Sequence, residues 1–199
     1  MGARASRLAV IFSAFAAGLV VCLGAILFVG GRGSGTGVIQ TAAIGGPFHL
    51  IDQNGQSFSD QDLKGKTFLV FFGFTHCPDV CPTTLFEISE ILRNLGPEAD
   101  KTAALFISVD PERDTPEAMR DYLASFDPHL RGLTGDPAAL AAVAKAYRVY
   151  YKKVPLEGDD YTMDHTAIVY LMDKEGRFVS PFNMKRTAEA AAADLRKHL

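Results

Sequence analysis

The run TFLVFFGF at residues 67–74 is the sequence feature that most narrows what this chain can fold into. It is apolar, rich in aromatic side chains, and does not alternate with polar residues, as expected of a central strand covered on both faces. Residues 82–95 follow with apolar side chains at helical spacing, and Gly96 and Pro97 end that pattern. A buried strand that leads into an amphipathic helix predicts an α/β fold.

The rest of the pattern extends this prediction. Residues 103–109 (AALFISV) predict a second buried strand, which a right-handed crossover places parallel to the first, with the helix across one face. Asn54-Gly55 and Asp173–Gly176 predict turns between adjacent strands. The other expected elements are strands at 48–51, 57–58, 167–172 and 177–182 and helices at 116–126, 137–147 and 187–198. This order predicts a thioredoxin-like α/β fold, with a central mixed sheet flanked by helices.

A different kind of segment precedes the domain. Residues 8–31 carry no charged side chain, and this run exceeds the roughly 18–20 residues that cross a bilayer as a helix. It is also longer than the apolar core of about 7–15 residues in a cleavable signal peptide. Arg4 and Arg7 precede it, which puts the N-terminus in the cytoplasm by the positive-inside rule. The expected organisation is a cytoplasmic N-terminus at 1–7, a transmembrane anchor at 8–29, a Gly-rich linker at 30–44 and a folded domain at 45–199.

This topology predicts where the domain works. It lies in the periplasm if the membrane is a bacterial inner membrane, or in the intermembrane space if it is the mitochondrial inner membrane. The linker sequence GGRGSGTG at 30–37 is typical of a flexible tether, which lets the domain reach a partner in the same membrane. All 23 acidic residues follow residue 51 but three of the 20 basic ones precede it, so the remainder has a formal net charge of −6. An acidic domain argues against a nucleic-acid partner.

Two cysteines, Cys77 and Cys81, lie in the segment FTHCPDVCP between the predicted central strand and its helix. Open α/β sheets bind ligands at that edge. Cys81 comes at the helix start, where the dipole and free N–H groups favour a thiolate. If the turn is helical from Cys77, a separation of four residues brings both sulfurs to one face. The pair can then grip a metal ion, exchange with a disulfide, or form a structural disulfide, although the usual redox motif has two intervening residues rather than three.

Three sequence blocks resemble the signature of the Sco/SenC copper chaperones: CPDVCP at 77–82, SVDPERDTPE at 108–117 and YTMDHTAIVYL at 161–171. They occur in the family's order and at comparable spacing, and the resemblance covers about residues 45–199. It implies a metallochaperone that delivers copper, as Cu(I) or Cu(II), to the dinuclear copper centre of cytochrome c oxidase during assembly. Its partners would be the copper-site subunit of the oxidase and either a thioredoxin-like reductant or another copper chaperone. The implied metal ligands are Cys77, Cys81 and His165.

The chemistry of these donors agrees with the resemblance. Two thiolates and one imidazole suit copper in either oxidation state, and three ligands leave an open face from which a partner can take the ion. Thioredoxin-like redox enzymes present a cis-proline to the dithiol just before the strand expected at 167–172, but residues 156–166 contain no proline. His165 is therefore expected to face the sulfurs. Zinc is an alternative metal, because two cysteines, one histidine and an open position also suit it.

Two other functions stay open from the sequence. The first is a thiol–disulfide oxidoreductase, with Cys77 and Cys81 as a redox dithiol that reduces the target's cysteines. The second is a copper or redox sensor whose state another protein reads. The three-residue spacing and His165 favour copper delivery over an enzyme, but one fold hosts all three functions.

The remaining candidates are weaker. Asp79 is interpreted as a solvated turn residue or as a group that tunes the copper or contacts a partner. Loop 110–114 is interpreted as a cap for the following helix with local charge pairs, as a docking element, or as a support for the metal ligands. Residues expected to have ordinary surface or packing roles are His49, His76, His129, His198, Met163 and Cys22.

Overall fold

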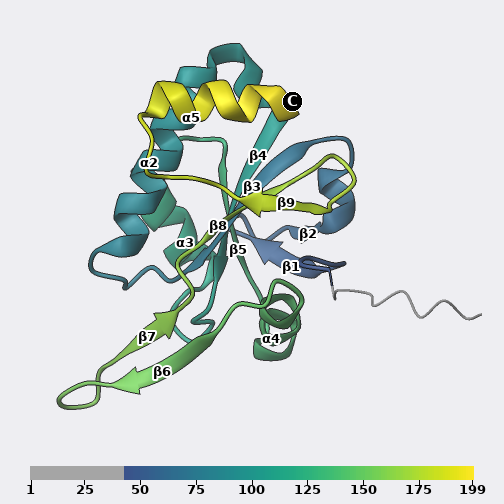
Figure 1. Ribbon diagram of the computed structural model, residues 1–199. Coiled ribbons are helices and arrows are strands. Elements are labelled where there is room, and N and C mark those ends of the chain that lie inside the picture. Colours follow the sequence, from purple (N-terminus) through teal and green to yellow (C-terminus); the bar gives the residue numbers. More distant parts are fainter. Residues whose placement is uncertain (1–42) are drawn as a thin grey trace, which may run out of the picture. The chain divides into compact units, whose positions relative to one another are not determined.

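A seven-stranded mixed sheet forms the centre of the part of the chain that the structure, a computed structural model, describes: residues 43–199 (Figure 1). The strand order is β2-β1-β5-β4-β3-β8-β9. Strands β3, β4 and β5 are parallel, whereas β8 runs antiparallel to β3. The strands are β1 (His49–Asp52), β2 (Ser57–Ser59), β3 (Thr67–Gly73), β4 (Thr102–Ser108), β5 (Leu130–Thr134), β8 (Val169–Met172) and β9 (Phe178–Pro181).

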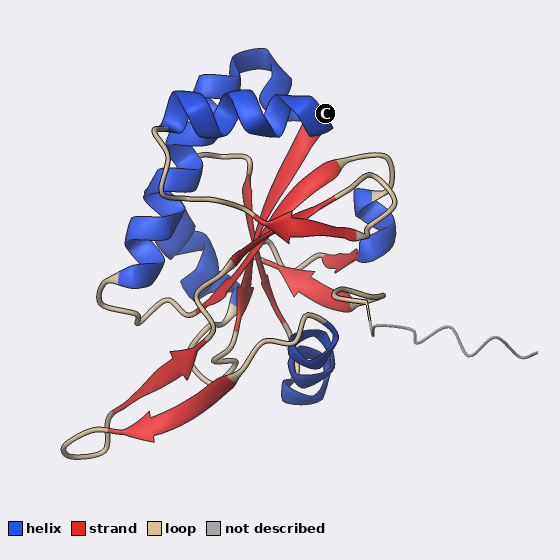
Figure 2. Cartoon of the chain, in the orientation of Figure 1, coloured by secondary structure: helices blue, strands red, loops and turns tan. Residues whose placement is uncertain are grey.

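Helices cover both faces of this sheet (Figure 2). Helices α2, α3 and α5 lie on one side and α4 on the other. Successive side chains of β3 show why both faces must be covered. Phe71 packs against Phe106 on one face, while Phe72 packs against Tyr147, at the end of α4, on the other. The helices are α2 (Val80–Leu95), α3 (Pro116–Leu123), α4 (Pro137–Ala146) and α5 (Ala188–Leu195), with short 3₁₀ turns at Asp60–Leu63, Gly96–Lys101 and Arg196–His198.

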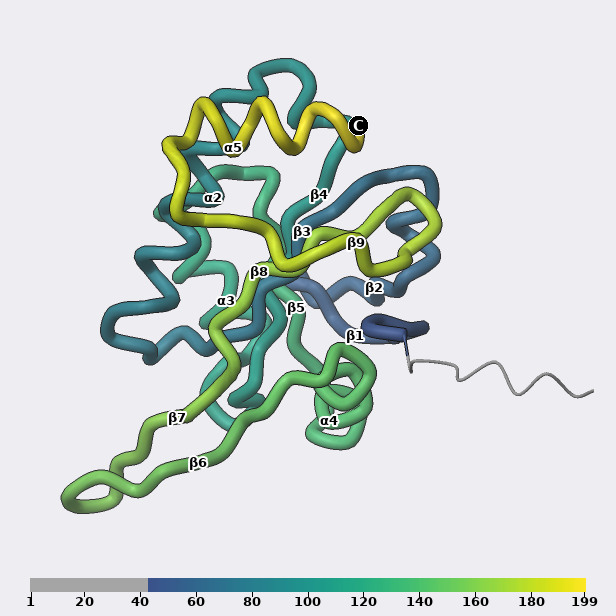
Figure 3. Tube along the Cα trace, in the orientation of Figure 1, coloured from purple at the N-terminus to yellow at the C-terminus, as the bar shows by residue number. Residues whose placement is uncertain are grey.

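A separate hairpin projects from this core (Figure 3). Strands β6 (Tyr151–Pro155) and β7 (Tyr161–His165) pair only with each other in an antiparallel ladder. Most of their side chains are partly or fully exposed. The hairpin matters for function because its last residue is His165.

The structure confirms the predicted α/β fold and corrects it in three strands. Strands β5, β6 and β7 are not predicted from the sequence, and His165 lies at the end of a strand rather than in the expected loop. Strand β5 is short, and Gly132 weakens its pattern. Gly132 is there because α3 lies so close that a Cβ atom would come within 2.7 Å of Leu123. Most side chains of the hairpin strands are exposed or half-buried, and Met163 is the one buried residue among them, so the apolar signal that marks a strand is weak.

Smaller differences concern element ends. Helix α2 begins two residues earlier than predicted, α3 ends at Leu123 instead of residue 126, and α5 covers only the middle of the predicted 187–198. Within residues 43–199, none of the helices combines the length and the apolar character that crossing a membrane requires. The predicted anchor at 8–29 and Cys22 lie outside the described residues.

Candidate metal centre

The two cysteines lie where β3 ends and α2 begins. Cys77 is in the connecting loop, and Cys81 is the second residue of the helix. The sulfurs were expected to lie on one face if the chain were helical from Cys77, but the helix begins only at Val80. They meet because the loop folds back, so that the backbone N–H of Cys81 donates to Cys77 Sγ at 3.4 Å.

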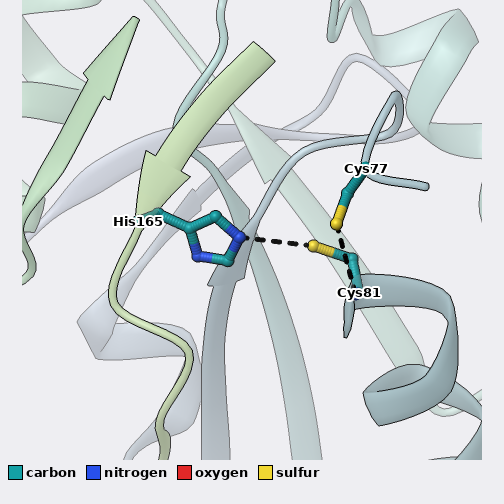
Figure 4. A group of neighbouring side chains, drawn as sticks. All are labelled: Cys77, Cys81 and His165. Atoms are coloured by element: carbon teal, nitrogen blue, oxygen red, sulfur yellow. Dashed lines mark hydrogen bonds between the residues drawn. The ribbon is translucent and has the colours of Figure 1, made fainter. Parts of the chain in front are cut away.

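His165 completes a cluster of three donors (Figure 4). Its Nε2 atom lies 3.5 Å from Cys81 Sγ. One donor atom from each of Cys77, Cys81 and His165 can be chosen so that all three lie within 4.8 Å of one another. In the part of the chain that the structure describes, this is the one such group of histidine, cysteine and acidic side chains. The structure thus brings together the three residues that the sequence singled out.

The imidazole of His165 is oriented for ligation. Its Nδ1 atom lies 3.2 Å from the carbonyl oxygen of Thr166, which can only accept, so Nδ1 carries the proton in the neutral ring and Nε2 presents its lone pair to the sulfurs. Burial lowers the pKa of His165 and favours that neutral ring, although the hydrogen bond to Thr166 opposes this effect. The rings of Phe71 and Phe74 pack edge-on against the imidazole and limit its rotation.

The thiols are buried to different extents. Cys81 is fully buried, whereas Cys77 is 8% exposed. Burial raises the pKa of the Cys81 thiol far above its usual range, which opposes the effect expected from its place at the helix start. Desolvation outweighs the helix dipole here. A bound cation would reverse this balance, because metal ligation displaces the thiol proton.

A buried carboxylate fixes the loop that carries Cys77. Asp114 accepts hydrogen bonds from the backbone N–H and the hydroxyl of Thr75 and from the hydroxyl of Ser108. Burial raises the pKa of Asp114, while these three donors oppose the shift. The loop at 110–114 therefore supports the dithiol loop directly through Asp114, in line with the supporting role that was one of the alternatives for this loop.

Gly73, the last residue of β3, makes room for the buried thiol. A Cβ atom at this position would lie 2.7 Å from Cys81 Sγ and 2.7 Å from the ring of Phe106. Both neighbours are buried and cannot withdraw. Gly73 is thus a residue of the site that the sequence analysis missed.

We expect Gly73→Ala to lower the free energy of unfolding by about 1–3 kcal/mol, the usual cost of overpacking a core, and to weaken metal binding by displacing Cys81. Gly46→Ala is the matched control, since its Cβ meets only Ala146 at an ordinary 3.6 Å. Denaturant unfolding and metal titration of both variants measure the effects. Equal, small losses in the two variants would contradict this account of Gly73.

An open cavity of about 330 Å³ gives access to two of the three donors, Cys77 and His165. Cys77 and His165 line it together with Met163, and the carboxylates of Asp79 and Asp164 lie at its walls. An ion bound by these donors would therefore be accessible from the cavity.

Among residues 43–199 both cysteines are free thiols, and we expect oxidant to convert them to a Cys77–Cys81 disulfide. Their sulfurs lie within 4.8 Å, so a modest loop movement can join them, with two electrons and two protons passing to the oxidant. Peptide mapping after alkylation measures this. Both cysteines should resist alkylation after oxidation and react again once a reductant is added. Two alkylatable thiols after oxidation would show that the loop cannot close.

The other described histidines are not in this cluster. His76 is exposed and its Nδ1 contacts the hydroxyl of Thr75, while His49 contacts Ser57. His129 binds Asp127 and Asp100, and His198 lies in the C-terminal 3₁₀ turn. Thr115 caps α3, as the sequence predicted.

The fold and these donors define a class: a thioredoxin-like α/β protein with a Cys₂His cluster, close enough together to hold a metal ion, at the end of its central strand. Comparisons with known proteins narrow the class. The SCO1/SenC family profile matches residues 36–199, which is most of the chain. The chain belongs to the SCO1/SenC family.

Solved and curated relatives agree with this assignment. The structure of Bradyrhizobium japonicum ScoI with copper bound is 69% identical, with a TM-score of 0.78 over 79% of this chain and 100% of that one. The SCO2-like protein RP587 of Rickettsia prowazekii is 42% identical over 73% of this chain and 72% of its own length. The mitochondrial SCO2 homolog of Homo sapiens is 40% identical over 82% of this chain, and the match covers 63% of the length of the human protein.

Proposed function

We propose that this protein binds one copper ion through Cys77, Cys81 and His165 and delivers it to the dinuclear copper centre of cytochrome c oxidase during assembly. The observation that carries the proposal is the cluster of two sulfurs and one imidazole nitrogen within 4.8 Å of one another, with Cys77 and His165 at the wall of an open cavity. Relatives in the same family are solved with copper bound.

The donor set supports copper on chemical grounds. Thiolates are soft ligands that select Cu(I), and imidazole accommodates both copper oxidation states. With Cu(I), two thiolates and a neutral His165, the site carries a net charge of −1, which the N-terminus of α2 offsets in part. Three donors leave an open coordination position, so a thiolate or imidazole of a partner can bind the ion before it is released.

Delivery also needs access to a target in the same membrane. The uncharged run and Gly-rich sequence before the domain support an anchor at residues 8–29 and a tether at 30–44. In this proposal the domain faces the periplasm, or the mitochondrial intermembrane space. The partner is the copper-site subunit of the oxidase.

A second candidate function is thiol–disulfide exchange, with Cys77 and Cys81 reducing the cysteines of the target. The free, adjacent thiols support it. Cys77 lines the cavity and would attack first, and the buried Cys81 would then close the Cys77–Cys81 disulfide and release the reduced target. His165, held facing Cys81 Sγ, favours metal binding over this function.

Metal analysis of the full chain, purified reduced in detergent and titrated with copper or zinc, tests the proposal. We expect one tightly bound copper per chain, which zinc does not displace. Preferential binding of zinc, or no stoichiometric binding of either metal, would refute copper delivery.

A further inference from the structure

The strand that ends in His165 does not pair with the main sheet and contacts the core through side chains such as Met163. Strands β6 and β7 form a sheet of their own, and an isolated two-stranded hairpin is at best marginally stable in water. Two hydrogen bonds close its base: the Thr166 backbone N–H donates to the Tyr150 carbonyl oxygen, and the Tyr150 backbone N–H donates to Thr166 Oγ1. Because His165 lies at that base, the hairpin needs a further tie to the core if Nε2 is to stay 3.5 Å from Cys81 Sγ.

Arg113, in the loop after β4, supplies such a tie. Its Nη1 donates to the backbone carbonyl oxygen of Tyr161 at 2.9 Å, and its guanidinium carbon lies 3.7 Å from the centre of the Tyr161 ring. The side chain of Arg113 is only 17% exposed, so these contacts are largely shielded from water. They join the start of β7 to the loop that follows a central strand.

Asp110 accepts hydrogen bonds from both Arg113 and Tyr161. One carboxylate oxygen accepts from Arg113 Nε at 2.6 Å, and the other accepts from the Tyr161 hydroxyl at 2.8 Å. Asp110 is 2% exposed, and its own backbone N–H donates to Ser108 Oγ at the end of β4. The carboxylate therefore anchors arginine and tyrosine to the rigid centre of the sheet.

The same arginine also reaches the dithiol side of the site. Its guanidinium carbon lies 5.8 Å from the centre of the Phe74 ring, and the Phe74 ring packs edge-on against His165 at 5.8 Å. Phe74 is the residue that follows β3, three positions before Cys77. Arg113 thus contacts the segment that leads to the sulfurs and the strand that carries the imidazole.

The arrangement also carries a cost. Arg113 Nη2 is buried without a hydrogen-bond partner within the described part of the chain. A buried donor left unpaired lowers the stability of the fold. We propose that Asp110, Arg113 and Tyr161 form a clamp that positions His165 against the dithiol.

The clamp rests on the proposed function only in assuming that His165 binds a metal. One of its two tests is made without metal, so failure of the clamp can be told apart from failure of the proposed function. Arg113→Gln removes the guanidinium, and Tyr161→Phe removes the hydroxyl that Asp110 accepts from while keeping the ring. Arg131→Gln is the matched control, because Arg131 also pairs with a buried aspartate, Asp52, and lies over an aromatic ring, Phe58.

The first readout is amide hydrogen exchange of the metal-free full chain. We expect Arg113→Gln to speed exchange at Tyr161–His165 by about tenfold or more relative to β3 and β4, because local opening sets exchange in such a hairpin. Tyr161→Phe should give a smaller change in the same direction, and Arg131→Gln none at the hairpin. This readout decides the clamp even if the chain binds no copper.

The second readout is the nitrogen signature of His165 in the electron paramagnetic resonance spectrum of the Cu(II) form. Arg113→Gln should weaken it and lower copper affinity by about 10–100-fold, as for other groups that orient a ligand, whereas Arg131→Gln should keep both. Normal hairpin exchange and a normal spectrum in both clamp variants would overturn the inference, as would equal loosening of the hairpin in Arg131→Gln.

Discussion

Cys81→Ser is expected to abolish stoichiometric copper binding and thiol–disulfide exchange together. The substitution replaces a soft, polarisable donor by a hydroxyl, which copper in its reduced form binds poorly. Cys81 contacts both other donors, through its backbone N–H to Cys77 Sγ and through its own sulfur to His165 Nε2. Copper affinity should therefore fall by more than the roughly 10–100-fold loss that follows removal of an outer-shell group.

The size of this effect can be checked against a cysteine that the proposal leaves out. Cys22→Ser, in the predicted anchor, should retain copper and the redox-active pair. Competitive titration against a Cu(I) chelator gives the affinities, and circular dichroism shows whether the domain still folds. Copper affinity within a factor of two or three of the unmodified chain in a folded Cys81→Ser protein would rule out Cys81 as a ligand.

His165→Ala should separate copper delivery from its rival, thiol reduction. The substitution removes one of three donors and leaves both thiols in place, so copper affinity and oxidase assembly should drop sharply while thiol–disulfide exchange persists. If the protein were mainly a reductase, His165 would be only a neighbour of the sulfurs, and assembly would be largely unharmed.

His76→Ala is the control for this variant. His76 directly precedes Cys77, but its imidazole is exposed and lies outside the donor cluster. It should leave copper binding, exchange and assembly unchanged. Copper stoichiometry, the dithiol reduction potential and oxidase activity are to be measured on both variants. Normal loading together with normal assembly in His165→Ala would contradict the assignment of His165.

The parts of the fold that sequence could predict are those governed by burial. The run at 67–74 is apolar because β3 is buried along its whole length, and α2 shows its period because one face packs on the sheet. The hairpin of β6 and β7 gives no such signal, since most of its side chains reach solvent. Its position depends on tertiary contacts such as that between Arg113 and Tyr161.

The site follows the same division. The resemblance of three sequence blocks to the Sco/SenC family singled out Cys77, Cys81 and His165 together, whereas the cysteine spacing alone left metal binding, thiol exchange and a structural disulfide open. The block SVDPERDTPE also stood out, but its contacts are with segments distant in the sequence and could not be predicted. Asp114 supports the cysteine loop, and Arg113 contacts the hairpin. The protonation of Cys81 could not be predicted either, because the helix start favours a thiolate and only the depth of burial decides against it.

X-ray absorption at the copper edge of the Cu(I)-loaded full chain tests the central claim most directly. The account predicts a first shell of two sulfurs and one imidazole nitrogen, which loses the nitrogen in His165→Ala and a sulfur in either cysteine variant that still retains copper. A shell made only of nitrogen and oxygen, or one unchanged in His165→Ala, would contradict it.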